Sequence, residues 1–361
     1  MIPVLYPANE TAFTTNGLGG LPDVISIVVT SRGNSPEVPF LEMEYPVDGL
    51  HYSDLAVERI IYATPQQGEH PQPFVIERIS RPINGVVTVY APHVSVGLQK
   101  LVTYGSTSTK WPGLVIDYFL GNALPAVEAS KWTRAPTSFS ANDGKLVRYT
   151  TPVSMMDVLM GTEGSVLDQF GGEFAFDHWS IVLYARQGKD TGLEVRYGVN
   201  MSDMTAKTDT SELVTAVVPY WKGTVNEVDT VVIGDMCSAS NASAYAYVRC
   251  IPLDVSQQFE LEADQQPTQA QVTAKGQSFI DGTALSELTM SINVKYTPLM
   301  ENRNINLCDT VRVVHPDLGV SSTAKVVETR YNTLIERYEE LTIGTMRQTI
   351  VDTIARLLGG S

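Results

Sequence analysis

The sequence predicts a mainly β protein of the α+β class, in which two small antiparallel β-barrels carry inserted α+β domains. Short β-branched and aromatic runs bounded by Gly and Pro fill the first hundred residues and recur beyond residue 210. Helical patterns between them are few and short. The chain has 361 residues, which is too many for one ordinary core, so two to four domains are expected.

The first predicted barrel spans residues 1–97. Short strands at regular spacing are typical of small barrels. The expected strands cover residues 2–6, 24–30, 40–46, 59–63, 72–76 and 85–90. The glycine-rich residues 17–20 precede a strand rather than a helix and lack the Lys-Ser/Thr of a phosphate loop, so they are interpreted as a plain turn.

An α+β insert is predicted at residues 98–210. It contains short helices at residues 113–120 and 155–160, the second with a Pro near its first turn. Alternating apolar and polar residues then predict strands, which cover residues 173–177, 179–184 and, after a Gly-rich turn, 193–197. We expect these three strands to form a β-meander with one buried face.

The second predicted barrel combines residues 211–250 and 298–344. A small α+β insert at residues 251–297 separates its halves, with a helix-like interval followed by a strand of period two. Residues 345–361 close the chain with an amphipathic helix. Its apolar stripe fits either packing on its own subunit or helix-to-helix contact about a threefold axis.

Motifs between residues 164 and 223 resemble the N-terminal hub region of phage tail-associated lysins, the prophage endopeptidase tail family. The residues that carry the resemblance are Gly164, Ser165, Leu167, Asp168, Gly171, Gly172, Glu173, Arg196, Tyr197, Gly198, Asn200, Pro219, Tyr220 and Trp221. The opening and closing segments resemble the same region. Cys308 stands where that family usually has Gly, and a left-handed turn there would strain any other residue.

The resemblance implies a phage baseplate hub architecture and a structural role at the tail tip of a phage or phage-like particle. A homotrimer with two barrels per subunit would form a ring that closes the tail tube and opens for passage of DNA or the tape-measure protein. The implied partners are the distal tail protein, the tail tube, the tape-measure protein, and receptor-binding or fibre proteins. The implied location is the virion tail tip, after assembly in the bacterial host cytoplasm.

Two other functions are open at this point. The chain would be the hub part of a tail-associated peptidoglycan hydrolase, an endopeptidase or lysozyme, if a catalytic domain absent here followed it. It would be a carbohydrate-binding receptor module if Trp111, Trp132 and Trp179 were exposed.

Composition excludes several classes of protein. The net charge is −15 and no Lys/Arg run could follow phosphates, so sequence-specific nucleic-acid binding is not expected. The excess of acidic side chains would either keep the protein soluble or, in a ring, line a lumen that repels DNA. No apolar segment approaches 18 residues and no export signal begins the chain, so neither a membrane location nor secretion is expected.

No catalytic, cofactor-binding or metal-binding residues are expected, and no cofactor. The densest set of chemical groups is Asp168, Glu173, Asp177 and His178, which prompts the hypotheses of glycoside hydrolysis and metal binding. Asp177 and His178 are adjacent in a predicted strand and should point to opposite faces, which argues against both hypotheses.

The remaining reactive side chains also lack a chemical pattern. His51 and His93 are far apart and have no Asp partner pattern, so surface or capping roles are expected. Glu42 and Glu44 share one strand face, which predicts a solvated face rather than an acid/base pair. The chain has three widely spaced cysteines, Cys237, Cys250 and Cys308. Their number and spacing favour neither a zinc site nor a disulfide framework.

Overall fold

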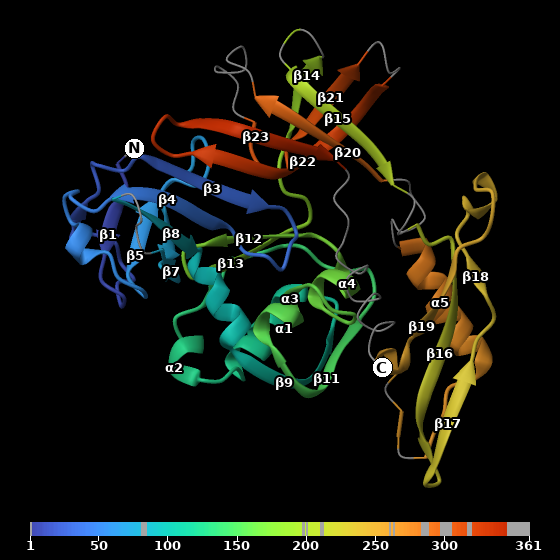
Figure 1. The fold of residues 1–361 in the computed structure, drawn as a ribbon. Coiled ribbons are helices and arrows are strands. Elements are labelled where there is room, and N and C mark those ends of the chain that lie inside the picture. Colours follow the sequence, from blue (N-terminus) through green and yellow to red (C-terminus); the bar gives the residue numbers. More distant parts are fainter. Residues whose placement is uncertain are drawn as a thin grey trace.

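The computed structural model describes ten stretches of the chain. These are residues 2–80, 85–196, 199, 201–209, 213–259, 261–262, 264–282, 289–296, 305–315 and 320–344. Their fold is mainly β, with short helices concentrated below one sheet (Figure 1). The described residues contain four hydrophobic cores, which divide the molecule into an N-terminal unit, an α+β unit, a C-terminal sheet and a β/α5 unit.

The N-terminal unit encloses its core between two sheets. One sheet has the order β2 (Gly19–Gly20), β1 (Val4–Tyr6), β5 (Ile60–Ala63) and β6 (Gln72–Val75). The other contains β3 (Ser26–Arg32), β4 (Phe40–Pro46), β8 (Val86–Pro92) and β7 (Arg78–Ile79). Alternate residues of β4 are buried, as a half-solvated strand requires. The strands predicted here are confirmed to within two residues.

The C-terminal sheet continues the second of those sheets. Its strands are β14 (Asp190–Arg196), β15 (Met201–Asp209), β20 (Thr289–Tyr296), β21 (Thr310–His315), β22 (Val320–Asn332) and β23 (Arg337–Gly344). The long strand β22 pairs with β21 through its first half and with β3 through its second half. Strands from the two ends of the chain therefore lie side by side (Figure 1).

The α+β unit packs five helical segments around β9 (Val102–Thr109), β10 (Thr133–Arg134), β11 (Lys145–Ser154), β12 (Glu173–Asp177) and β13 (Ser180–Tyr184). Its helices are α1 (Pro112–Gly121), α2 (Ala126–Ala129), α3 (Met155–Leu159), α4 (Val166–Phe170) and the 3-10 segment Val94–Lys100. Ser154 caps α3 through the N–H of Asp157. The predicted helices at 113–120 and 155–160 are confirmed.

The β/α5 unit stands apart on the right of Figure 1. It contains β16 (Ala216–Val225), β17 (Val228–Ile233), β18 (Cys237–Ser238) and β19 (Cys250–Asp254), with α5 (Gln269–Gly282) packed on them. Short 3-10 turns at Tyr52–Asp54, Ala242–Ala244 and Ser256–Gln258 complete the described elements. No helix in the described part of the chain combines the length and the apolar character needed to cross a membrane.

The predicted β-meander is wrong in its third strand. β12 and β13 form an antiparallel hairpin, but β14 leaves them and pairs in parallel with β21. Two hydrogen bonds fix this crossing, because the Lys189 N–H donates to the side-chain Oδ1 of Asp309 at 2.8 Å and the Thr310 N–H donates to the Lys189 carbonyl at 2.9 Å. The contacts that direct β14 therefore come from residues 120 positions away.

The larger predictions concern the two barrels, the domain boundaries and the C-terminal helix. No sheet among the described residues closes into a barrel, so the two-barrel arrangement remains a prediction. The described strands of 211–250 lie in a sheet apart from those of 298–344, and the domain boundaries also remain predictions. The helix predicted within residues 345–361 lies outside the described residues.

Candidate functional site

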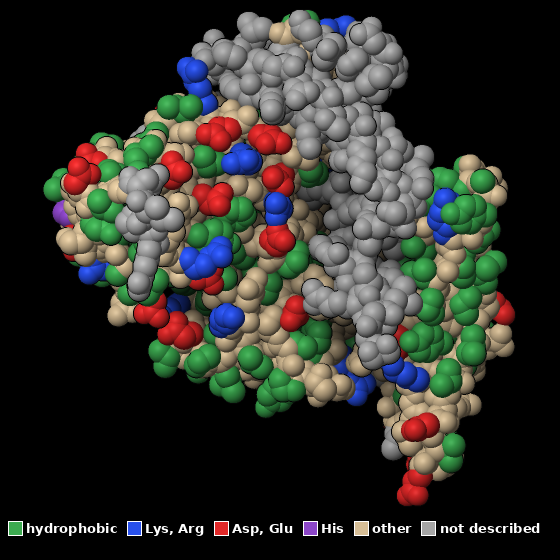
Figure 2. Space-filling model, viewed as in Figure 1, with side chains coloured by type: hydrophobic (Ala, Val, Ile, Leu, Met, Phe, Trp, Pro, Cys, Tyr) green, Lys and Arg blue, Asp and Glu red, His purple; other side chains and the backbone are tan. Residues whose placement is uncertain are grey.

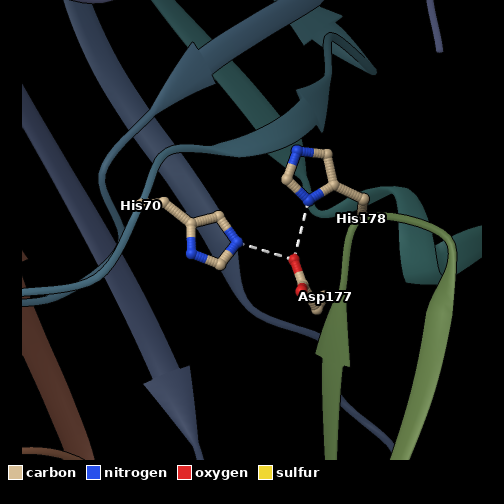
Figure 3. Close-up of side chains that lie close together, drawn as sticks. All are labelled: His70, Asp177 and His178. Carbon is tan, nitrogen blue, oxygen red and sulfur yellow. Dashed lines mark hydrogen bonds and ion pairs between the residues drawn. The ribbon is translucent and has the colours of Figure 1, made fainter. Parts of the chain in front are cut away.

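A cluster of polar side chains lies where the N-terminal unit meets the α+β unit. His70 comes from the loop between β5 and β6, Asp177 is the last residue of β12, and His178 follows it in the turn before β13 (Figure 3). One oxygen of Asp177, Oδ1, lies 2.8 Å from Nε2 of His70 and 2.7 Å from Nδ1 of His178. Two imidazoles therefore converge on a single carboxylate oxygen.

Gln72 and His93 stabilise this cluster through hydrogen bonds. The Nε2 of Gln72 donates to Asp177 Oδ1 at 3.0 Å, and its Oε1 accepts from the backbone N–H of His178 at 2.7 Å. His93 lies 3.3 Å from the same Oε1, and its Nδ1 accepts from the N–H of Ser95. Both ring nitrogens of His93 are thus engaged in a neutral imidazole, which fixes the orientation of the Gln72 amide.

Burial and hydrogen bonding act on the pKa values of this cluster. His93 is only 2% exposed, and burial lowers its pKa to about 3, with the His178 charge acting in the same direction. Partial burial raises the pKa of Asp177, but hydrogen bonds from Gln72, His178 and His70 outweigh that effect and hold it below its usual range. The Asp177 carboxylate is therefore ionised at neutral pH.

The prediction that Asp177 and His178 point to opposite faces is wrong. His178 has a φ of 52° and lies in the turn after β12, not within the strand. This left-handed conformation folds its ring back toward the Asp177 carboxylate. Sequence analysis also missed His70 and Gln72, because no local pattern connects them to residues more than 100 positions away.

The other two members of the predicted set lie elsewhere. Asp168 accepts from the N–H of Gly164 at 2.8 Å, and burial raises its pKa to about 6. Glu173 is 9% exposed, forms an ion pair with Lys325 of β22, and accepts from the N–H of Gln187 at 2.7 Å. Glu173 therefore joins the α+β unit to the C-terminal sheet and does not face Asp177.

Most interpretations of isolated residues are confirmed. His93 caps a 3-10 segment, and Glu42 and Glu44 lie on the exposed face of β4. The expectation that His51 has no Asp partner is wrong, because its Nδ1 lies 3.0 Å from Asp54 Oδ2. Residues 17–20 form a turn that ends in β2. Trp132 is buried in the core of the α+β unit. Trp111, Trp132 and Trp179 therefore do not form an exposed platform together.

Exposed apolar side chains are the second feature of functional interest. β17 is an edge strand among the described elements, and its residues Val231 and Ile233 are 58% and 59% exposed. They lie on the same face because side chains alternate along a strand. Figure 2 shows hydrophobic side chains over this unit at the right of the molecule.

A second exposed apolar surface, the α1 patch, lies on the α+β unit. Val102 and Tyr104 of β9 share a face, and Val102 bridges to Leu124. Leu114 and Tyr118 of α1 are four residues apart, on one side of the helix. All five side chains are at least 38% exposed. Large exposed apolar groups of this kind are typical of contact surfaces between proteins.

Comparison with known proteins agrees with this fold. Residues 189–354 match the family model described as Prophage endopeptidase tail. The fold is similar to that of the prophage tail protein gp18 from Listeria monocytogenes EGD-e, with a TM-score of 0.63, 15% identity and 99% of each chain covered. The resemblance to phage tail proteins is confirmed.

Two further tail proteins have similar folds. The 43 kDa tail protein of prophage MuSo2 from Shewanella oneidensis has a TM-score of 0.61 at 10% identity, with 98% of this chain and 100% of that chain covered. The tail protein from Neisseria meningitidis MC58 has a TM-score of 0.58 at 10% identity, with 98% of each covered. A search of curated protein sequences found no match.

Proposed function

We propose that this chain is a structural hub protein of the tail tip or baseplate of a phage or phage-like particle. The observation that carries the proposal is the similarity of fold to prophage tail proteins over 98–99% of this chain. The family match at residues 189–354 supports the same proposal independently. In this role the protein acts by its surfaces, through the area and symmetry of its contacts.

In the proposed assembly, three copies form a ring that closes the tail tube and opens for DNA or the tape-measure protein. The edge strand β17 and the α1 patch supply apolar contact surfaces. An edge strand has backbone N–H and C=O groups available for pairing with another chain. The distal tail protein, the tail tube and fibre proteins are the proposed neighbours. If acidic side chains of this chain, whose net charge is −15, line the lumen of the ring, they would repel passing DNA.

The proposal is tested by measuring the mass of the purified chain in solution and imaging it by negative-stain electron microscopy. We expect a particle of three times 39.5 kDa with a central opening. Because some rings form only on a neighbour, the measurement is repeated with the distal tail protein added. A chain that remains monomeric in both conditions would contradict the hub proposal.

A second candidate function comes from the word endopeptidase in the description of the matching family. In that case the chain would belong to a tail-associated peptidoglycan hydrolase. Purified cell walls distinguish the two functions, because a hydrolase clears their turbidity and releases soluble muropeptides. We expect no clearing by this 361-residue chain, and clearing would replace the structural proposal with an enzymatic one.

A further inference from the structure

His70, Asp177 and His178 bring two imidazole nitrogens and one carboxylate oxygen together. A neutral imidazole nitrogen without hydrogen presents a lone pair, and so does every oxygen of a carboxylate. The nitrogens of His70 and His178 lie within 2.8 Å of the same Asp177 oxygen. In neutral rings each of these nitrogens can carry the N–H that donates to the Asp177 oxygen, and a metal ion can take the place of both protons. The structure therefore gathers three potential ligand atoms, all within 4.8 Å of one another.

We propose that His70, Asp177 and His178 bind one divalent transition-metal ion, with Zn²⁺ the best fit to two imidazoles and a carboxylate. Zinc binds such nitrogen and oxygen atoms at about 2.0–2.2 Å, which places tetrahedral ligand atoms roughly 3.3 Å apart. The two contacts to Asp177 must therefore open by roughly half an ångström. A fourth position is left for water or for a group from a neighbouring protein.

The surroundings supply the hydrogen bonds that metal ligands need. The Oη of Tyr62 lies 3.0 Å from Nε2 of His178, so it accepts the proton that remains on this ring when Nδ1 binds the metal. Gln72 donates to Asp177 and is itself oriented by His93, which is buried. The ligands from the β12–β13 turn are thus held in place before any ion arrives.

An ion can reach the site from solvent. The side chain of His70 is 59% exposed and that of Asp177 is 48% exposed. An open hollow of about 350 Å³ borders Asp177 and His178. The loop that carries His70 includes Gly68, whose φ is 78°. Movement of this loop would lengthen the contact between His70 and Asp177 without disturbing the buried residues Gln72 and His93. The contact between His178 and Asp177 would lengthen by adjustment of these two neighbouring side chains.

Metal binding at this place would fasten two parts of the fold together. His70 belongs to the N-terminal unit, and Asp177 and His178 belong to the α+β unit. The same junction contains Phe13, whose ring stacks on Trp179 at 5.9 Å between centroids. An ion that binds only the folded chain stabilises it by mass action. The proposed metal is therefore a structural clamp between these two units, and it is independent of the hub proposal.

The test is titration of the tag-free, EDTA-treated full chain with Zn²⁺ by calorimetry, together with thermal unfolding. We expect one saturable site per chain and a rise in Tm of a few degrees in excess Zn²⁺, reversed by EDTA. Co²⁺ in place of Zn²⁺ should give the visible absorption of a tetrahedral site with nitrogen and oxygen ligands. Absence of saturable binding by the native chain would overturn the proposal, leaving imidazole N–H groups as the hydrogen-bond donors to Asp177.

Variants locate the site on the chain. His70→Gln removes an exposed ligand and should weaken Zn²⁺ binding by more than about tenfold, since changes to outer residues alone cost about 10- to 100-fold. Asp177→Asn should do the same. His51→Gln is the matched control, because His51 pairs with Asp54 at 3.0 Å and no third potential ligand joins them among the described residues. Equal affinity in the native chain and His70→Gln would rule out this site even if zinc binds elsewhere.

Discussion

The side chain of Asn34 joins the N-terminal unit to the start of β12, because it forms hydrogen bonds with the backbone of both Phe174 and Gly172. Its Oδ1 accepts from the N–H of Phe174 at 2.9 Å, and its Nδ2 donates to the carbonyl of Gly172 at 3.0 Å. Asn34 itself is buried and has a φ of 47°. Asn is one of the few residues that adopt this conformation readily.

Replacing Asn34 should therefore destabilise the fold at this contact. In Asn34→Ala the buried N–H of Phe174 and the half-buried carbonyl of Gly172 lose their partners, and the left-handed conformation becomes unfavourable. Together these changes should cost about 3 kcal/mol of unfolding free energy. Asn34→Gly removes the same hydrogen bonds but tolerates the φ, so its loss should be smaller by about 1 kcal/mol. Urea unfolding of both variants measures this difference. Equal losses would show that backbone strain contributes nothing.

Gly188 should not tolerate a side chain. Its φ is 78°, and a Cβ atom there would lie 2.2 Å from the carbonyl oxygen of Cys308, which has a left-handed φ of 68° itself. Gly188→Ala must push two backbones apart and should cost more than about 2 kcal/mol. Gly192→Ala is the control, since its φ is 58° but no atom of the described residues lies within 4 Å of the added Cβ. Chemical denaturation should show the control losing only about 1 kcal/mol.

The ion pair between Glu173 and Lys325 should matter for stability. Both side chains are largely buried, so Glu173→Ala leaves a positive charge without its partner and should cost about 3 kcal/mol. Glu173→Gln still accepts from the N–H of Gln187 and should lose less. Lys325→Met removes the charge with similar length. Combining Glu173→Ala with Lys325→Met should recover part of the loss, and additive losses in thermal unfolding would contradict the pairing.

His93 should make the protein less stable in acid. Its pKa is about 3 when folded and 6.5 when exposed, so only the unfolded state takes up its proton between these values. Its contribution is complete above about pH 6.5 and decreases as pH falls, by up to about 3 kcal/mol at pH 4.5. His93→Gln should lose this part of the pH dependence. The difference in stability between the two proteins, followed from pH 7 to pH 4.5, checks the prediction; a constant difference would refute it.

Assembly should depend on the edge strand β17. Changing Val231 and Ile233 together to Lys places charges on its exposed apolar face, which should prevent ring formation without changing the Tm. The matched control is Val57→Lys, an equally exposed change on the N-terminal unit. Light scattering gives the mass of each variant. A double variant that still assembles would show that β17 is not a contact surface.

Local sequence patterns were sufficient to predict most individual elements. Alternation along residues 40–46 predicted β4 because side chains of a strand point to opposite faces, and the short helix starting at Met155 followed from its flanking Ser and Pro. The ordered motifs from residue 164 to residue 223 also led to the resemblance with tail proteins. These properties depend on neighbours in the chain.

Only the tertiary structure decided which distant residues meet. β14 pairs with β21 because Lys189 and Asp309 hold the crossing, and no pattern near residue 190 indicates that partner. His70 reaches Asp177 across 107 positions because the turn at His178 adopts a positive φ and the two units pack together. Local preferences determine the conformation of short segments, whereas contacts between units depend on the packing of the whole chain, which one sequence does not display.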